Sequence, residues 1–247
     1  MSETPQTVIC LKWGDRYGPE FVNRLHSMVA RNTSRPLRFV CLTDDPGGLA
    51  DDVETLPMPA FDLPEEFRFH PFRRMFLFQE RLEGLSGDIL HFDLDIVVTG
   101  SIDGFFDHKP GCSFCVTENW TQPGAGIGNM SVFRFRVGAH TNIWDMFRAN
   151  PAAQKRKYRN SQTFFSRNAR QQEFFPPDWC LSFKHSLLPR WPLNFLVAPK
   201  LPGTARVVAF TGKPDQDEAL KGVYPAKWWK RIYKHVRPTP WIGEHWR

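Results

Sequence analysis

Residues 87–103 of the chain read GDILHFDLDIVVTGSID, a mostly apolar run that two carboxylates, Asp93 and Asp95, interrupt. A short apolar run between glycines is typical of a buried strand. Side chains two positions apart in an extended chain point the same way, so the two acids can converge on one point. Convergent carboxylates favour a divalent cation such as Mg²⁺ or Mn²⁺. The alternative is that each acid caps a turn or pairs with an arginine.

The segments before this run alternate between strand and helix patterns. The predicted elements are strands at residues 7–11, 37–43 and 53–57 and helices at residues 19–32 and 72–85. Repeated strand and helix units imply an α/β fold with a mostly parallel central sheet flanked by helices. Ligands of such sheets lie beyond the carboxyl ends of the strands. The loop 13–18 and the two acids follow such ends, so we expect them to face one ligand.

The second half of the chain is less regular. Strands are predicted at residues 112–117, 130–135 and 206–211, and a helix at residues 141–150. The middle strand alternates apolar and polar residues, which indicates a half-exposed strand. Residues 155–170 are rich in Arg, Lys, Asn, Gln and Ser, and we expect a mobile or cationic surface segment there. Since no repeat or linker interrupts the chain, a single domain over residues 1–247 is predicted.

The chain carries its own control for the acidic pair. Asp215 and Asp217 have the same spacing, but they lie in a polar, highly charged segment. Such a setting is typical of a solvated surface. His91, which precedes the first pair, is expected to face away from the carboxylates and to pack in the core or lie at the surface.

The net charge, the cysteine content and the length of the apolar runs indicate which partners and which cellular compartment to expect. The 247 residues carry a formal net charge of +6 and a pI near 9.2, which favours anionic partners. The chain has five cysteines, an odd number. Three of them lie in predicted strands or apolar segments, which suits reduced core thiols of a cytoplasmic protein. No apolar run approaches the roughly 18 residues that a membrane span needs.

The acidic run resembles a known segment. Residues 91–106 are similar to the metal-binding segment of GT-A fold glycosyltransferases, nearest to glycosyltransferase family 8 and its uncharacterised bacterial relatives. The resemblance implies a GT-A (Rossmann-like) domain in which residues 1–106 bind the nucleotide and residues 107–247 form the acceptor side. It also implies transfer of a sugar, in the simplest case a hexose, from a nucleotide diphosphate donor, with a UDP-sugar favoured.

The resemblance assigns donor-side roles to several residues. Trp13, Gly14 and Tyr17 match the base-binding start of that fold, although aromatics of a core loop would look the same. Arg74 matches a basic residue directed at the donor phosphates, or is an ordinary cation near a helix end. Asp93 is expected to bind ribose and metal.

The resemblance also extends to the acceptor side. Asp178, before Trp179, is the expected catalytic or acceptor-orienting carboxylate, with helix capping as the alternative. Asn129 is expected to contact the donor sugar, or to stabilise a glycine-rich turn. Trp179 offers a surface on which a sugar could stack.

A late family motif is incomplete. The family's H-x-x-G-x-x-K-P-W adds a histidine to the metal and a lysine to the diphosphate, whereas this chain has Ala209 at the histidine position and Lys213 directly after Gly212. Lys213 is the expected phosphate ligand, or a surface cation. Two carboxylates, water and substrate oxygens would then hold the metal, which suits Mg²⁺ or Mn²⁺.

The tail, residues 224–247, interleaves tryptophans with lysine and arginine. Two interpretations stay open: peripheral contact with the anionic inner face of a membrane, or a C-terminal helix that covers the sheet. The function expected overall is metal-dependent transfer of a sugar to a glycan acceptor, in polysaccharide or lipopolysaccharide synthesis. A metal-dependent nucleotidyl or phosphoryl transferase and a basic nucleic-acid-binding module are the alternatives, although no nucleic-acid partner is expected.

Overall fold

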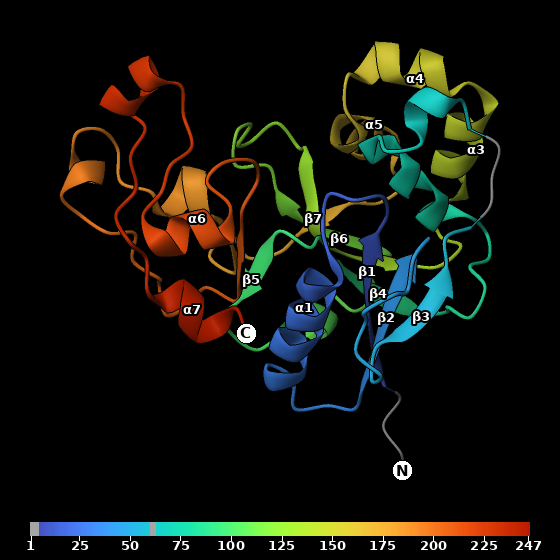
Figure 1. Cartoon of the computed structure of the whole chain (residues 1–247). Coiled ribbons are helices and arrows are strands. Elements are labelled where there is room, and N and C mark those ends of the chain that lie inside the picture. The colour runs from blue at the N-terminus through green and yellow to red at the C-terminus, as the bar shows by residue number, and fades with distance from the viewer. Residues whose placement is uncertain (1–4, 60–62) are drawn as a thin grey trace.

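The computed structural model describes residues 5–59 and 63–247. A seven-stranded sheet with the order β3-β2-β1-β4-β7-β6-β8 forms its centre (Figure 1). The strands are β1 (Gln6–Lys12), β2 (Leu37–Thr43), β3 (Glu54–Pro57), β4 (Asp88–Phe92), β6 (Phe114–Glu118), β7 (Gly128–Arg136) and β8 (Glu173–Phe174). Strands β3, β2, β1 and β4 are parallel, and β7 is antiparallel to β4 and β6. The predicted α/β fold, one domain with a helix-flanked central sheet, is confirmed.

Helices bury both faces of this sheet. Neighbouring residues of β1 belong to two separate cores, Val8 and Cys10 to one and Ile9 and Leu11 to the other, because successive side chains of a strand alternate between faces. One face is covered by α1 (Pro19–Arg31). The other is covered by η2 (Pro71–Phe78), α3 (Thr141–Ala149) and α5 (Ser161–Asn168), while α4 (Pro151–Tyr158) lies against α3 and α5.

A second, three-stranded sheet adjoins the first. It consists of β5 (Ile96–Val98), β10 (Val207–Ala209) and β9 (Cys180–Ser182), with β10 in the middle. Because β4 ends at Phe92 and β5 begins at Ile96, the chain changes sheets across the acidic pair. The two acids therefore lie in the gap between the sheets.

Two local predictions in the middle of the chain were wrong. The helix predicted over residues 72–85 is the 3₁₀-helix η2, which ends at Phe78. Residues 155–170, predicted to be a mobile or cationic surface segment, belong largely to α4 and α5: the end of α4 is cationic and at the surface, but the segment is helical and α5 is partly buried. Asn150 and Asn160 cap these helices through their side chains, and α5 buries Phe164 and Phe165 against the sheet.

Strand β7 is not half-exposed as predicted, because residues 128–135, the polar ones included, are all buried. Arg134 is only 1% exposed, and its guanidinium donates hydrogen bonds of 2.8 Å to the carbonyls of Phe105, Phe106, His108 and Lys109. These carbonyls lie at and just beyond the end of α2 (Asp103–Asp107), where backbone acceptors lack partners within the helix. The polar residue Arg134 in the alternating pattern of β7 thus caps the end of α2 inside the protein and does not face solvent.

The C-terminal region is not the single covering helix that was one of the two interpretations. It contains α6 (Gln216–Lys221), the 3₁₀-helix η5 (Trp228–Ile232) and α7 (Trp241–His245). The tail packs against the domain from Val236 onward: Val236, Thr239 and Ile242 are fully buried, and the Trp246 ring lies 5.8 Å from that of Phe21 on α1. Short helices also form at η1 (Glu65–Phe67), η3 (Phe183–Leu187) and η4 (Leu193–Phe195).

All five cysteines are buried and unpaired, two more than the three that the sequence pattern placed in the core. Over residues 5–59 and 63–247, the helices are too short or too polar to cross a lipid bilayer.

Candidate active site

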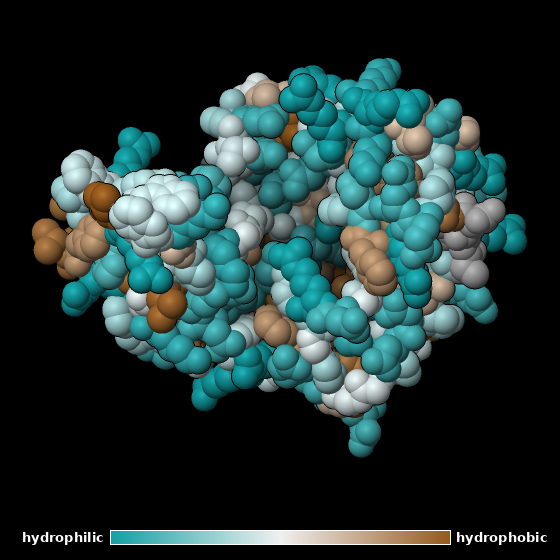
Figure 2. Space-filling model, turned by 45° about the horizontal axis from the view of Figure 1, so that its top comes forward, coloured by the Kyte–Doolittle hydropathy of each residue, from teal (hydrophilic) through white to brown (hydrophobic). Residues whose placement is uncertain are grey.

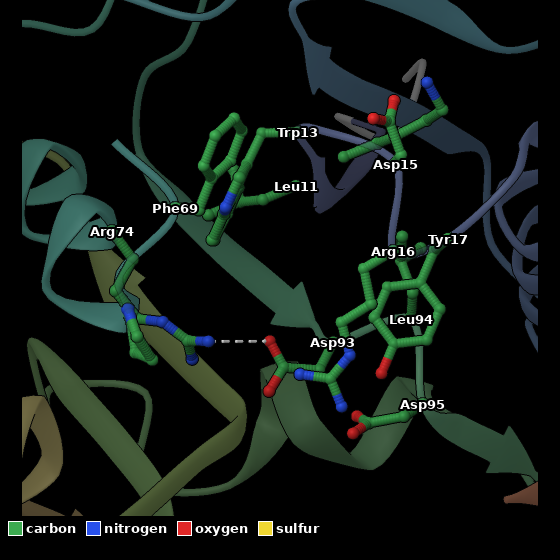
Figure 3. Close-up of a pocket in the computed structure, with 12 residues that line it drawn as sticks. Leu11, Trp13, Asp15, Arg16, Tyr17, Phe69, Arg74, Asp93, Leu94 and Asp95 are labelled. Carbon is green, nitrogen blue, oxygen red and sulfur yellow. Dashed lines mark ion pairs between the residues drawn. The ribbon is translucent and has the colours of Figure 1, made fainter. Parts of the chain in front are cut away.

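A cavity of about 370 Å³ opens where β1 and β4 end. Three segments surround it: the loop after β1, the start of η2 and the turn between β4 and β5 (Figure 3). Its walls are formed by Leu11, Lys12, Trp13, Asp15, Arg16, Tyr17, Phe69, Pro71, Arg74, Asp93, Leu94 and Asp95. The structure thus brings together the loop and the acidic pair that the sequence pattern placed at one sheet edge.

Backbone hydrogen bonds to both sheets hold the acidic turn. The amide of Asp93 donates to the carbonyl of Ser131 on β7 at 2.9 Å, and the carbonyl of Asp95 accepts from the amide of Phe210 at 2.8 Å. Both carboxylates point into the cavity (Figure 3). The position of the pair is therefore set by two sheets rather than by a flexible loop.

Asp95 is the less stabilised of the two acids. Burial, followed by the charge of Asp93, raises the pKa of Asp95 to about 7. Its Oδ1 atom is buried and has no hydrogen-bond partner in the described part of the chain. Burial, followed by the charge of Asp95, also raises the pKa of the Tyr17 hydroxyl. A cation between the carboxylates would remove this cost.

Arg74 lies where the resemblance placed a donor-directed cation. Its guanidinium is 3.2 Å from Oδ1 of Asp93 and donates to the carbonyl of Met130 at 2.8 Å. The alternative in which an acid pairs with an arginine is therefore realised for Asp93. Because the exposed fractions of the Arg74 and Asp93 side chains are 12% and 24%, the pair is partly shielded from water.

Arg16 is a site residue that the sequence prediction did not single out. Figure 3 shows its guanidinium extending from the loop after β1 toward the two carboxylates. Its charge is one of the influences that lower the pKa of Asp95 against the larger effect of burial. Its position in the loop 13–18, two residues after Gly14, was the sequence feature that could have identified it.

Aromatic side chains form the wall beside this charged floor. Trp13, Tyr17 and Phe69 all line the cavity. Gly14 has φ +61°, and a Cβ atom on it would lie 2.7 Å from Cε1 of Phe69. Glycine is therefore required by both backbone conformation and space. Phe69 gave no sequence signal, because only the fold brings it to Gly14.

The structure does not bring Lys213 to the cavity wall. Its ammonium group donates to Asp215 and to Glu218, each at 2.6 Å, at the start of α6. Ala209, which stands at the family's histidine position, is buried in β10 and pairs with Ile96. The surface-cation alternative therefore describes the geometry of Lys213.

Asp178 is also apart from the cavity. It is exposed and precedes β9, whereas the cavity lies beyond the opposite end of the small sheet, where β10 leads into Phe210. The Trp179 ring is not an open stacking surface as expected, because the Arg206 guanidinium covers it at 3.7 Å.

Asn129 lies close to the site without lining the cavity. It is buried near the start of β7, and its side-chain oxygen accepts from the amide of Ser131 at 2.9 Å. Ser131 in turn holds the amide of Asp93. The alternative in which Asn129 stabilises local backbone therefore describes this contact.

His91 does not face away from the acids as predicted. Residues two apart share a strand face, and the His91 Nε2 atom lies 3.9 Å from Oδ1 of Asp93. The ring is fully buried and stacks on Phe133 with centroids 4.4 Å apart. Burial lowers the pKa of His91 to about 3, so the ring packs beneath the site as a neutral group.

The donor set suits a divalent cation with few protein ligands. Across residues 5–59 and 63–247 there is no group of three or more His, Cys, Asp and Glu side chains arranged to hold a metal. Asp93 and Asp95 would supply two carboxylates, and the unpartnered oxygen of Asp95 fits this role. Mg²⁺ is commonly held by one or two carboxylates together with water and substrate phosphates.

No family model matches the sequence, and neither does any curated protein. Solved structures do match. The galactosyltransferase LgtC, in complex with donor and acceptor sugar analogues, is 13% identical, with a TM-score of 0.59 over 85% of this chain and 89% of that chain. The glycosyltransferase GlyE of Streptococcus pneumoniae TIGR4 is 12% identical, with a TM-score of 0.58 over 85% of this chain and 56% of that chain.

The bifunctional glycosyltransferase WbbM in its apo form is 10% identical, with a TM-score of 0.51 over 87% of this chain and 47% of that chain. Identities this low establish a shared fold, because folds host many activities and function must be argued from the site. The chain has the GT-A-like fold of these glycosyltransferases.

Proposed function

We propose that this protein is a metal-dependent glycosyltransferase that moves a sugar from a nucleotide diphosphate donor to a glycan acceptor. The observation that carries the proposal is the convergence of Asp93 and Asp95, one with an unpartnered oxygen, at the floor of an aromatic and cationic cavity. A UDP-hexose is the favoured donor, and a polysaccharide or lipopolysaccharide precursor the favoured acceptor. The fold shared with glycosyltransferases supports this assignment.

Asp93 and Asp95 would hold Mn²⁺ or Mg²⁺ through their carboxylate oxygens. When bound, such an ion stabilises the negative charge of the leaving diphosphate as the bond to the sugar breaks. Arg74 and Arg16 flank the acids and add positive charge that shares this role. Because their guanidinium groups reach the cavity whereas Lys213 does not, we assign the phosphates to these arginines.

The remaining walls suit the base and ribose of a nucleotide. Trp13 and Phe69 offer aromatic faces, and Gly14 lets the chain approach Phe69 closely. Tyr17 stays protonated because its pKa is raised, so its hydroxyl can donate a hydrogen bond near the acids. Asn129 would act indirectly, through the Ser131 backbone that holds Asp93. No contact with substrate is proposed for Asp178.

The test is incubation with UDP-, GDP- and dTDP-sugars in the presence and absence of Mn²⁺. Slow release of free sugar that depends on Mn²⁺ is expected, because water replaces the absent acceptor. Cleavage within the diphosphate would instead indicate a nucleotidyl or phosphoryl transferase. Calorimetry with UDP and Mn²⁺ adds a second measurement: if Asp95→Ala binds UDP with Mn²⁺ as the parent does, the site assignment is wrong.

A further inference from the structure

Two distant segments, residues 190–197 and 227–235, form a projection that we name the aromatic lobe. It stands apart from the seven-stranded sheet beside α6 (Figure 1). The Trp191 indole donates to the carbonyl of Ile232 at 3.1 Å, and the buried amide of Asn194 donates to the carbonyl of Tyr233 at 2.9 Å. The rings of Phe195 and His235 stack with centroids 4.4 Å apart. The lobe is therefore one packed unit.

The surface of this unit is unusually apolar. Among residues 5–59 and 63–247, all but one of the exposed large hydrophobic side chains lie between residues 191 and 233, the exception being Phe69 in the cavity. Trp228 is 77% exposed, Leu196 75% and Ile232 68%. Figure 2 shows hydrophobic residues gathered at the tip of the projection on the left. An exposed cluster of this kind marks an interaction surface.

The charge of the lobe has a single sign. Residues 190–197 and 227–235 contain five Lys and Arg and no Asp or Glu. Since the whole chain has a net charge of +6, the other residues together carry a net charge of only +1. The cations of the lobe are Arg190, Lys227, Lys230, Arg231 and Lys234. None of them has an acidic partner in the part of the chain that the structure describes.

The exposed apolar side chains and the cations of the lobe together favour an anionic lipid bilayer as its partner. A second copy of the lobe would be repelled, because both surfaces are cationic. Nucleic acid would pair with the cations and stack on the tryptophans, but aliphatic tips such as Leu196 and Ile232 gain nothing from a phosphate backbone. An anionic bilayer suits the aliphatic, tryptophan and cationic side chains of the lobe alike. Acyl chains receive the aliphatic side chains, the interface favours tryptophan, and anionic headgroups attract lysine and arginine.

We propose that the aromatic lobe is a peripheral membrane-binding element that inserts Trp228, Ile232 and Leu196 into the interface of an anionic bilayer. Its cations, led by Lys230 and Arg231, contact the lipid headgroups. The inference does not depend on the proposed sugar transfer, because it uses a different surface from the cavity.

The test is sedimentation of the full chain with vesicles of phosphatidylcholine, with or without a quarter of phosphatidylglycerol. The parent is expected to bind the anionic vesicles and to remain in solution with the neutral ones. The double variant Trp228→Ser/Ile232→Ser should bind about tenfold more weakly or worse, because it removes inserted apolar surface. Both residues are largely exposed, so circular dichroism should show an unchanged fold.

A matched pair of charge variants tests whether binding to the anionic vesicles depends on the lobe. Lys230→Glu/Arg231→Glu on the lobe should lose binding, whereas Arg156→Glu/Lys157→Glu on α4, with the same change in charge, should keep most of it. Equal losses in the two variants would overturn the proposal in favour of general electrostatic attraction. Binding that survives Trp228→Ser/Ile232→Ser and is displaced by duplex DNA would overturn it in favour of a polyanion site. No nucleotide sugar is present, so failure here leaves the proposed transfer untouched.

Discussion

Two segments of this chain have the same Asp-x-Asp spacing and opposite surroundings. Asp93 and Asp95 lie between two sheets at the floor of a cavity, and one carboxylate oxygen is buried without a partner among the residues that the structure describes. Asp215 begins α6 in a capping box with Glu218 and forms an ion pair with Lys213. Spacing alone therefore says little about function.

The difference lies in how each carboxylate is satisfied. Asp215 is paired within a few residues and Asp217 is exposed to water, so the local chain accounts for both acids. At the cavity, Arg74 forms an ion pair with Asp93, and the charges of Arg16 and Arg74 act on Asp95. Burial nevertheless raises the pKa of Asp95. A structure that keeps an unfavourable carboxylate indicates a ligand that the carboxylate is meant to bind.

The largest effect is expected for Asp95→Asn. Loss of a cation-binding charge should lower sugar transfer by about 100-fold or more, comparable to removing one group that stabilises a transition state. Because the substitution also removes a buried charge repelled by Asp93, the free energy of unfolding should not fall. Transfer assays and urea denaturation test the two parts. An active variant, or an inactive one that is also destabilised, would contradict the functional interpretation of the pair.

A smaller loss is expected for Arg74→Met. The variant removes the ion pair with Asp93 but keeps the apolar stem that packs beside the cavity. We expect kcat/KM for the nucleotide sugar to fall about 10-fold or more, in line with the loss of a charge-assisted contact. Steady-state kinetics give the value. Lys213→Met is the matched control, and an equal loss there would restore the phosphate role predicted for Lys213.

Asp215→Ala should affect stability rather than activity. The substitution removes the capping box of α6, which is worth about 1 kcal/mol. Urea denaturation should show that loss, while sugar transfer should stay close to that of the parent. If transfer collapsed with the fold intact, the two acidic pairs would share the catalytic role and the contrast between them would fail.

The smallest effect belongs to Asp217→Ala. Asp217 is exposed on the first turn of α6. Its replacement should change the free energy of unfolding by no more than about 0.5 kcal/mol, as for most surface substitutions. Thermal melting and the transfer assay provide the measurement. This variant is the baseline against which Asp95→Asn is compared.

The parts of the fold that follow from local pattern were predicted well. The strand predicted at residues 37–43 has those bounds, and the helix from Pro19 ends at Arg31. These segments have strong periodicity and clear ends, which are features of the sequence itself. The cavity loop and the acidic pair were also placed together correctly, because parallel strands present their carboxyl ends at one edge.

The errors arose where polar residues have partners distant in sequence. The alternation of β7 was interpreted as exposure, yet Arg134 is buried because the end of α2 needs donors. Residues 155–170 were judged by composition, although Phe164 and Phe165 anchor a helix there. Composition reports the average solvent preference of a segment, not the contacts of single residues.

Local pattern alone decides that Asp93 and Asp95 are largely withdrawn from solvent and that Asp217 is exposed, because apolar neighbours draw a strand into the core. Packing between distant segments decides the rest. It brings Phe69 to Gly14, Arg74 to Asp93, and the two halves of the aromatic lobe to each other, while it leaves Asp178 at the far end of the small sheet. Such contacts depend on the relative position of whole elements, which neighbouring residues along the chain do not specify.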